Sequence, residues 1–422
     1  MSRITKYALS DLYKMSSGIS STKEQAGHGA PFVSFSTVFN NYFLPDELPD
    51  LMDTNEKEQE IYSIKAGDVL ITRTSETIDE LAMSCVAVKD YPKATYSGFT
   101  KRLRPKKEGI AYPKYMAFYF RSELFRKAVT NNAFMTLRAS FNEDIFTFLD
   151  VYLPIYEEQV RIGDMLYAVE CKIQKNKEIN DYLEQQLQLL YDYWFTQYNF
   201  PNEDGQPYKA SNGLMVWNKM INHLIPADWK VKPLGTICSF RNGINYDKNV
   251  DGNTIYKIIN VRNISSSTLF LNESTFDEIC LPKQQGDKYC VSDESIIIAR
   301  SGIPGATRIL CNPSSNIIFC GFIICCTPSD NTLQNYLTLY LRQFEGSSAT
   351  QTGGSILKNV SQETLKNLIV PIPPQSLLNQ FNDSILPIYN LINSNTKENV
   401  QLITLRDWLL PMLMNGQTTI ED

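Results

Sequence analysis

The chain has 422 residues, of which 43% are hydrophobic and 20% are charged, so it is long enough for two or three domains with a large buried core. A net charge of −6 does not favour nucleic-acid binding by the chain as a whole, although a local basic patch can still bind phosphate. The two histidines and nine cysteines contain no Cys-x-x-Cys pair or zinc-site spacing, which predicts buried, reduced thiols in a cytosolic protein.

The first 155 residues are predicted to form a mixed α/β domain. Residues 67–73 read as a turn, a short apolar strand and then Arg73. Tyr96-Ser97-Gly98-Phe99 follows, and residues 112–127 have the apolar spacing of an amphipathic helix. Strands and helices that alternate in this way are typical of a globular α/β unit.

A long helix is predicted over residues 156–200. Its apolar seam has alternating spacings of four and three, which is the pattern of a helix packed along one stripe, close to a coiled coil. At 1.5 Å per residue, about 40 residues extend roughly 60 Å. The seam positions are Ile162, Leu166, Val169, Ile173, Asn176, Asn180, Leu183, Leu187, Leu190 and Trp194.

A linker and a second α/β domain are predicted over residues 201–374. The linker is rich in Asn, Gly, Pro and Asp and reads as a surface connection, although its apolar residues suggest that it packs against something. Residues 292–300 then resemble residues 67–73, and Phe319-Cys320-Gly321-Phe322 resembles Tyr96-Ser97-Gly98-Phe99. Residues 333–344 again have the spacing of an amphipathic helix.

A second long helix, followed by a tail, is predicted over residues 375–422, because a shift of 219 positions maps the first seam onto it. Nine of the ten shifted positions keep their apolar or Asn character, and Pro154 maps onto Pro373. The chain therefore contains an internal duplication. The shifted positions are Phe381, Ile385, Ile388, Ile392, Asn395, Asn399, Leu402, Arg406, Leu409 and Leu413.

The duplication predicts an α+β fold in which two mixed α/β domains are separated by an antiparallel pair of coiled-coil-like helices, with pseudo-two-fold symmetry. Neither helix can bury its apolar stripe alone, but each stripe is buried if the two helices pack against one another. Asn176, Asn180, Asn395 and Asn399 would fix the register of the pair, or would mark a water-filled interruption of the stripe. Two similar but non-identical domains at a fixed distance suit duplex DNA with a bipartite site, whose two halves differ in sequence.

Seven motifs lie in the helices and the linker, at residues 154–159, 190–195, 199–201, 205–209, 225–229, 405–411 and 413–416. They resemble motifs of the specificity subunits of Type I restriction-modification enzymes, and the resemblance covers the whole chain in architecture. One departure is that Leu377-Leu378 stand where the second copy would repeat Glu158-Gln159.

The resemblance implies a non-catalytic subunit whose two domains are target-recognition domains. In this family the subunit binds double-stranded DNA and joins two modification subunits, which bind S-adenosylmethionine and methylate adenine N6. Restriction (motor-nuclease) subunits add ATP-dependent cleavage with Mg²⁺. We therefore expect no cofactor or metal in this chain, no membrane partner, and a cytoplasmic location.

The candidate DNA contacts are polar or basic residues after the matched strands, in one basic run, and before each long helix. Arginine can read guanine, hydroxyl groups suit bases or phosphates, and the basic run suits phosphates. An internal salt bridge or a solvated loop is an equal alternative for any single residue, and for the basic run a solvated charged surface is the stronger one. In the first half they are Arg73, Thr74, Ser75, Lys101, Arg102, Arg104, Arg138 and Ser140, with Lys106 and Lys107 completing the run. In the second half they are Arg300, Ser301, Gly302, Thr352, Gly353, Gly354 and Ser355.

Large aromatic residues near the helix ends are candidate anchors for the modification subunits, because such side chains often dominate interfaces. They are Tyr191, Trp194, Phe195 and Trp408, and internal packing is at least as good an explanation for them. Three other functions stay open: a related two-component system in which one partner both methylates and cleaves, a helical scaffold that never touches DNA, and an enzyme. The last is weakest, because the sequence has no Asn/Asp-Pro-Pro-aromatic turn and no Walker loop.

Overall fold

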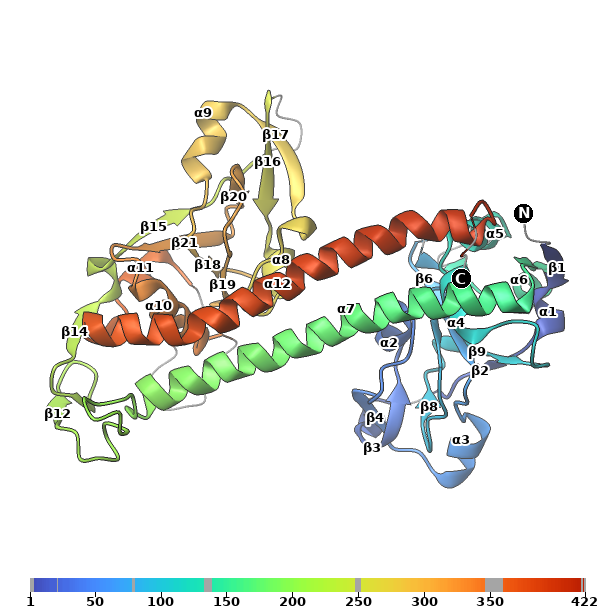
Figure 1. Ribbon diagram of the computed structural model, residues 1–422, viewed down its shortest axis with the longest axis horizontal. Helices are drawn as coiled ribbons and strands as arrows, with labels where there is room; N and C mark the ends of the chain where they lie inside the picture. The colour runs from blue at the N-terminus through green and yellow to red at the C-terminus, as the bar shows by residue number, and fades with distance from the viewer. Residues whose placement is uncertain are drawn as a thin grey trace. The chain divides into compact units, whose positions relative to one another are not determined.

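The computed structural model describes residues 4–20, 22–77, 80–132, 139–246, 252–345, 360–418 and 420. The chain folds into two compact units (Figure 1). The first unit is Met1–Lys175 with Gln401–Asp422, and the second is Asn176–Val400. Each unit therefore holds one of the predicted α/β domains and a part of each long helix.

The first unit is built on a four-stranded antiparallel sheet of order β2-β9-β5-β7. A three-stranded sheet, β4-β3-β8, has one antiparallel and one parallel pair, and β1-β11 and β6-β10 are two-stranded. The strands are β1 (Thr5–Ala8), β2 (Tyr13–Ser17), β3 (Ala26–Val33), β4 (Asp50–Met52), β5 (Val69–Thr72), β6 (Thr74–Ser75), β7 (Ser84–Val86), β8 (Thr95–Tyr96), β9 (Thr100–Pro105), β10 (Ala139–Ser140) and β11 (Asp150–Leu153). The helices are α1 (Leu9–Leu12), α2 (Phe35–Asn40), α3 (Glu56–Ile61), α4 (Pro113–Tyr119), α5 (Glu123–Asn132) and α6 (Glu143–Phe148).

The second unit repeats this topology. Its four-stranded antiparallel sheet is β15-β21-β18-β19, and its three-stranded sheet, β17-β16-β20, again has one antiparallel and one parallel pair. The strands are β14 (Lys230–Pro233), β15 (Cys238–Asn242), β16 (Thr254–Ile259), β17 (Asp277–Leu281), β18 (Ile296–Ala299), β19 (Thr307–Ile309), β20 (Ile317–Phe319), β21 (Ile323–Pro328) and β22 (Ile369–Ile372), the last paired with β14. The helices are α8 (Val261–Ser265), α9 (Lys283–Gly286), α10 (Leu333–Arg342) and α11 (Gln362–Lys366). The matching strand orders confirm the duplication.

The strands that were predicted from apolar runs lie at the centre of these sheets. Every residue of β5 and of β18 is buried, which is why both read as unbroken apolar runs instead of an alternation. The turn before β5 is held by Asp68, whose carboxylate accepts a hydrogen bond from the Lys65 amide at 2.8 Å. This bond fixes the turn at the start of β5.

The two long helices are α7 (Tyr156–Tyr191) and α12 (Gln375–Met414), and α7 continues into a π-helical turn, Asp192–Thr196. In the second unit, Asn176 bonds Asn399 and Asn395 bonds Asn180. Residue numbers rise along α7 as they fall along α12, so this contact is antiparallel, as predicted. The asparagines are bonded to each other, which favours register fixing over a water-filled interruption.

Two sequence interpretations need correction. The linker is not only a surface connection, because it contains the hairpin β12 (Met215–Asn218) and β13 (His223–Pro226), while Phe200, Ile225 and Trp229 join the core of the second unit as the apolar residues suggested. The thiols are unpaired, but Cys171 and Cys280 are exposed and not buried. Among the described residues, no helix is both long enough and apolar enough to span a bilayer.

Candidate nucleic-acid interface

In the first unit, the predicted contacts after β5 lie in one place. The amide of Arg73 donates to the carbonyl of Phe99 at 2.8 Å, and the carbonyl of Arg73 accepts from Phe141 at 2.8 Å, so the backbone is fixed while the side chain is exposed. Thr74 pairs with Ser140 in the β6-β10 ladder. Ser75 is buried and its hydroxyl accepts from the Thr77 amide, which is a turn-forming role.

Lys101 joins this group from β9. Its ammonium donates to the Ser17 hydroxyl at 2.9 Å. Partial burial and the nearby positive charge of Arg73 lower the pKa of Lys101. The negative charge of Glu143 partly opposes this pKa shift. An incoming phosphate would stabilise the two neighbouring cations, Arg73 and Lys101.

The rest of the basic run does not form one patch, because successive residues of a strand face opposite sides. Arg102 is buried, donates to the Ser63 carbonyl and lies over the Tyr96 ring. Arg104 makes a two-pronged ion pair with Asp68, at 2.8 and 2.6 Å, and this hydrogen bonding raises its pKa. Both guanidiniums therefore already have partners within the fold.

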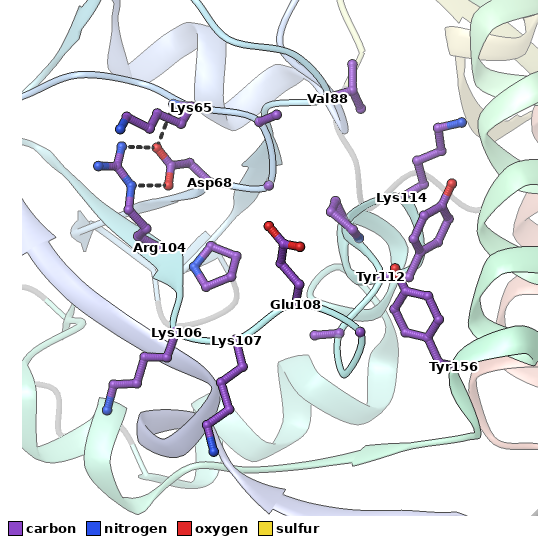
Figure 2. Close-up of a pocket in the computed structure, with 16 residues that line it drawn as sticks. Lys65, Asp68, Val88, Arg104, Lys106, Lys107, Glu108, Tyr112, Lys114 and Tyr156 are labelled. Carbon is purple, nitrogen blue, oxygen red and sulfur yellow. Dashed lines mark hydrogen bonds and ion pairs between the residues drawn. The ribbon is translucent and has the colours of Figure 1, made fainter.

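Lys106 and Lys107 follow β9 at the rim of a pocket of about 530 Å³ (Figure 2). The Lys106 ammonium donates to the Ser10 carbonyl at 2.6 Å, and Lys114 on another wall pairs with Asp164 at 2.7 Å. The Glu108 carboxylate points into the pocket (Figure 2). Because the pocket carries acids as well as paired cations, its lining does not form a clear anion site.

The second unit places its candidates in the same way. The amide of Arg300 donates to the carbonyl of Phe322 at 2.9 Å, and its exposed guanidinium donates to the Gly321 carbonyl at 3.3 Å. Ser301 is half-buried. Gly302 has φ +78°, and a Cβ there would lie 2.7 Å from the Val261 side chain. Only glycine fits this turn without strain.

A pocket of about 410 Å³ lies beside Phe322, and it adds residues that the sequence analysis missed. Asn245, Asn260 and Arg262 contribute amide and guanidinium groups to its lining, and both Asn260 and Arg262 also bond the Asp277 carboxylate. Asn and Arg are the side chains best suited to adenine and guanine edges. Their clustering depends on β15, β16 and β20 coming together, and no local pattern in the sequence marks it.

Five of the predicted contacts lie outside the described residues: Arg138, Thr352, Gly353, Gly354 and Ser355. Among the described residues, no group of three or more His, Cys, Asp or Glu side chains is arranged to hold a metal ion.

Comparison with known proteins identifies the family. The sequence matches the Type I restriction modification DNA specificity domain over residues 1–185 and 226–402, which is most of the chain and both halves of the duplication. This chain belongs to that specificity family.

Similar proteins share nearly the full length of the chain. The specificity subunit of the Type I restriction enzyme MjaIX of Methanocaldococcus jannaschii is 23% identical over 409 residues, which cover 95% of this chain and 89% of that protein. That of HindI of Haemophilus influenzae is 22% identical over 444 residues, covering 92% and 94%. The crystal structure of the Type I restriction-modification S subunit of M. genitalium has a TM-score of 0.55 at 13% identity and covers 98% of this chain and 96% of that one, which supports the fold.

Three of the four aromatic residues that were predicted as partner anchors of this specificity subunit are internal. Tyr191, Trp194 and Phe195 are 2%, 7% and 4% exposed. They pack around Phe381 of α12, with ring centroids 6.4, 5.5 and 4.7 Å away. The expectation of an exposed anchor is therefore corrected to internal packing, and only Trp408 of the four is exposed, at 64%.

The specificity subunit does expose other apolar residues on α7 and its continuation. Ile179, Tyr182, Leu189 and Tyr193 are 37%, 66%, 68% and 40% exposed. Their spacings of three, seven and four place them on one side of a helix. The regular apolar spacing in the sequence marks only the buried seam, so this exposed stripe was not predicted.

Proposed function

We propose that this specificity subunit reads DNA sequence for a Type I restriction-modification complex, with each α/β domain reading one half of a bipartite target. The observation that carries the proposal is the duplicated placement of Arg73 and Arg300. Each is exposed, follows the central buried strand of its sheet, and has its amide bonded to the carbonyl of an exposed phenylalanine. Base readers need exposed side chains on a rigid backbone, and these positions provide them.

The long helices would set the distance between the two half-sites. Their antiparallel contact contains paired asparagines in the second unit and a buried Glu170–Arg406 ion pair in the first. A slipped register would leave these polar groups without partners, which is the physical reason for a fixed separation. In this proposal the coiled-coil-like pair, with its predicted pseudo-two-fold symmetry, would be the spacer between the two DNA-reading domains.

Two modification subunits are the proposed protein partners, together with restriction subunits in the complete enzyme. The exposed stripe of Ile179, Tyr182, Leu189 and Tyr193, and Trp408 on α12, are suitable docking residues, because exposed aliphatic and aromatic side chains in rows mark interfaces. S-adenosylmethionine, ATP and Mg²⁺ would be bound by those partners. This chain would supply recognition and assembly and no catalytic group.

The competing function is a helical scaffold that bridges two proteins without touching DNA. The net charge of −6 and the exposed apolar stripe favour it. Both functions predict assembly with partner subunits, so assembly alone does not separate them. Binding of the assembled complex to DNA does.

The test is to co-express the chain with its modification subunits and map the adenines that become methylated, together with a nuclease footprint of the purified complex. The expected result is one bipartite motif with a fixed gap and two protected half-sites. Methylation without any shared motif, or no protection at any sequence, would leave the scaffold as the better account.

Single substitutions in that complex test which side chains contact the bases. Arg300→Ala and Arg73→Ala are each expected to weaken binding by about 1–3 kcal/mol and to relax one base position in one half-site. Lys127→Ala is the control, because Lys127 lies on α5 in an exposed ion pair with Glu123. Equal weakening on every DNA sequence would show that the arginine binds phosphate instead of a base.

A further inference from the structure

Two phenylalanines stand exposed at matching turns of the two units. Phe99, between β8 and β9, is 65% exposed, and Phe322, between β20 and β21, is 63% exposed. A single exposed phenylalanine needs no explanation. An exposed phenylalanine at the same point of two diverged copies does need an explanation, because neither ring is packed in the core of its unit.

The turn that carries Phe99 is held rigidly on both sides. The Gly98 amide donates to the Ile19 carbonyl at 2.7 Å, and the Thr100 amide donates to the Ser97 carbonyl at 2.9 Å. The carbonyl of Phe99 itself accepts from Arg73. The backbone of the tip is therefore fixed while its ring is directed to solvent.

The turn that carries Phe322 has the same three hydrogen bonds. The Gly321 amide donates to the Ile244 carbonyl at 2.8 Å, and the Ile323 amide donates to the Cys320 carbonyl at 3.0 Å. The carbonyl of Phe322 accepts from Arg300. Both copies therefore have the same local structure: a rigid turn with an exposed phenylalanine ring, whose backbone carbonyl is bonded to an arginine amide.

Charged and polar groups lie beside both rings and indicate the kind of ligand. Phe99 lies beside Arg73, whose positive charge contributes to the lowered pKa of Lys101. Phe322 lies beside Arg300 and lines a pocket to which Asn245 contributes an amide, among apolar residues such as Ile244 and Val261. A flat ring among guanidinium and amide groups suits DNA bases, whose faces and thymine methyl groups are apolar and whose flanks are phosphates.

We propose that Phe99 and Phe322 are apolar base-contacting tips, one for each half of the target, and that each packs against bases of its own half-site beside the strand-end arginine. This rests on the proposed function. Because the ring has only two rotatable bonds and its backbone is fixed, little conformational entropy is lost on contact. The contact would add to the affinity for the cognate sequence and not to the affinity for DNA in general.

The test compares Phe99→Ala and Phe322→Ala in the complex assembled with the modification subunits. Phe148→Ala and Ile255→Ala are the matched controls, because these side chains are 75% and 57% exposed on the same two units, away from the turns. Dissociation constants are measured on the cognate duplex, on duplexes with one or the other half-site scrambled, and on unrelated DNA. Thermal unfolding checks that each variant keeps its fold.

Each phenylalanine variant is expected to lose roughly 5- to 100-fold in affinity for the cognate duplex and little on unrelated DNA. Scrambling one half-site should remove the effect of one variant, and scrambling the other half-site should remove the effect of the other. Wild-type affinity in both variants, an equal loss on unrelated DNA, or failure to assemble with the modification subunits would overturn the inference. A wild-type complex without sequence preference would instead overturn the proposed function.

Discussion

The side-chain amide of Asn176 on α7 donates to the side-chain oxygen of Asn399 on α12 at 3.0 Å, inside the helix seam. Asn395 donates to Asn180 at 2.9 Å one turn away. The duplication relates Asn176 to Asn395 and Asn180 to Asn399, so each bond joins the first asparagine of one copy to the second asparagine of the other. Such reciprocal pairing is what a two-fold contact between two copies of one helix produces.

The first prediction concerns the stability that this pairing supplies. Asn176→Ala and Asn399→Ala are each expected to lower the free energy of unfolding by about 1–3 kcal/mol, because each removes the hydrogen bond between these two buried side chains. The double variant should lose less than the sum of the two, and urea unfolding of all four proteins measures the coupling. Gln186→Ala on the exposed side of α7 is the control. Additive losses would mean that the two amides do not stabilise one another.

The second prediction concerns the buried ion pair in the first unit, where Arg406 lies 2.7 Å from Glu170 and over the Tyr42 ring. Both side chains are nearly buried, at 12% and 8% exposure. Arg406→Leu should destabilise the chain by about 3–5 kcal/mol, because it leaves an uncompensated carboxylate. Adding Glu170→Leu should recover most of that loss in the same unfolding experiment. A double variant as unstable as Arg406→Leu would show that the loss comes from packing and not from charge.

The third prediction concerns Trp194 and Trp408, which were both predicted as partner anchors but differ in burial. Trp194→Ala should lower the free energy of unfolding by about 3–5 kcal/mol, because the ring is buried against Phe381. Trp408→Ala should change it by less than about 0.5 kcal/mol, because the ring is exposed. If Trp408 docks a modification subunit, its variant should instead weaken assembly by about 2 kcal/mol or more, measured by titration calorimetry. Wild-type assembly would remove Trp408 from the docking surface.

The arrangement of distant segments could be predicted where the sequence contains an internal repeat. The seam spacing and the shift of 219 positions predicted both helices, their duplication and the antiparallel contact. The positions of Arg73 and Arg300 followed from the apolar runs before them, since such runs are buried strands. These predictions depend on periodicity and on internal comparison, both of which the sequence contains.

What could not be predicted depends on contacts between distant residues. Arg104 is paired by Asp68, which lies 36 positions away, and Phe195 is covered by Tyr336 from a helix of the second domain. The exposure of Phe99 and Phe322 could not be anticipated either, because an aromatic residue next to an apolar strand usually belongs to the core. Strand alternation alone, however, would have shown that Lys101 and Arg102 face opposite sides of β9.

The last prediction concerns the glycines under the two exposed tips. A Cβ at Gly18 would lie 2.1 Å from the Ser97 carbonyl oxygen, and one at Gly243 would lie 2.1 Å from the Cys320 carbonyl oxygen. Gly18→Ala and Gly243→Ala must therefore push apart the backbones that carry the turns, at a loss of about 1–3 kcal/mol in stability. Each should also weaken binding to one half-site only. Gly205→Ala is the control, since no atom lies within 4 Å of its Cβ and its positive φ alone should lower stability by about 1 kcal/mol. Gly18 and Gly243 variants that bind both half-sites like the wild type would show that the position of the tips does not matter for recognition.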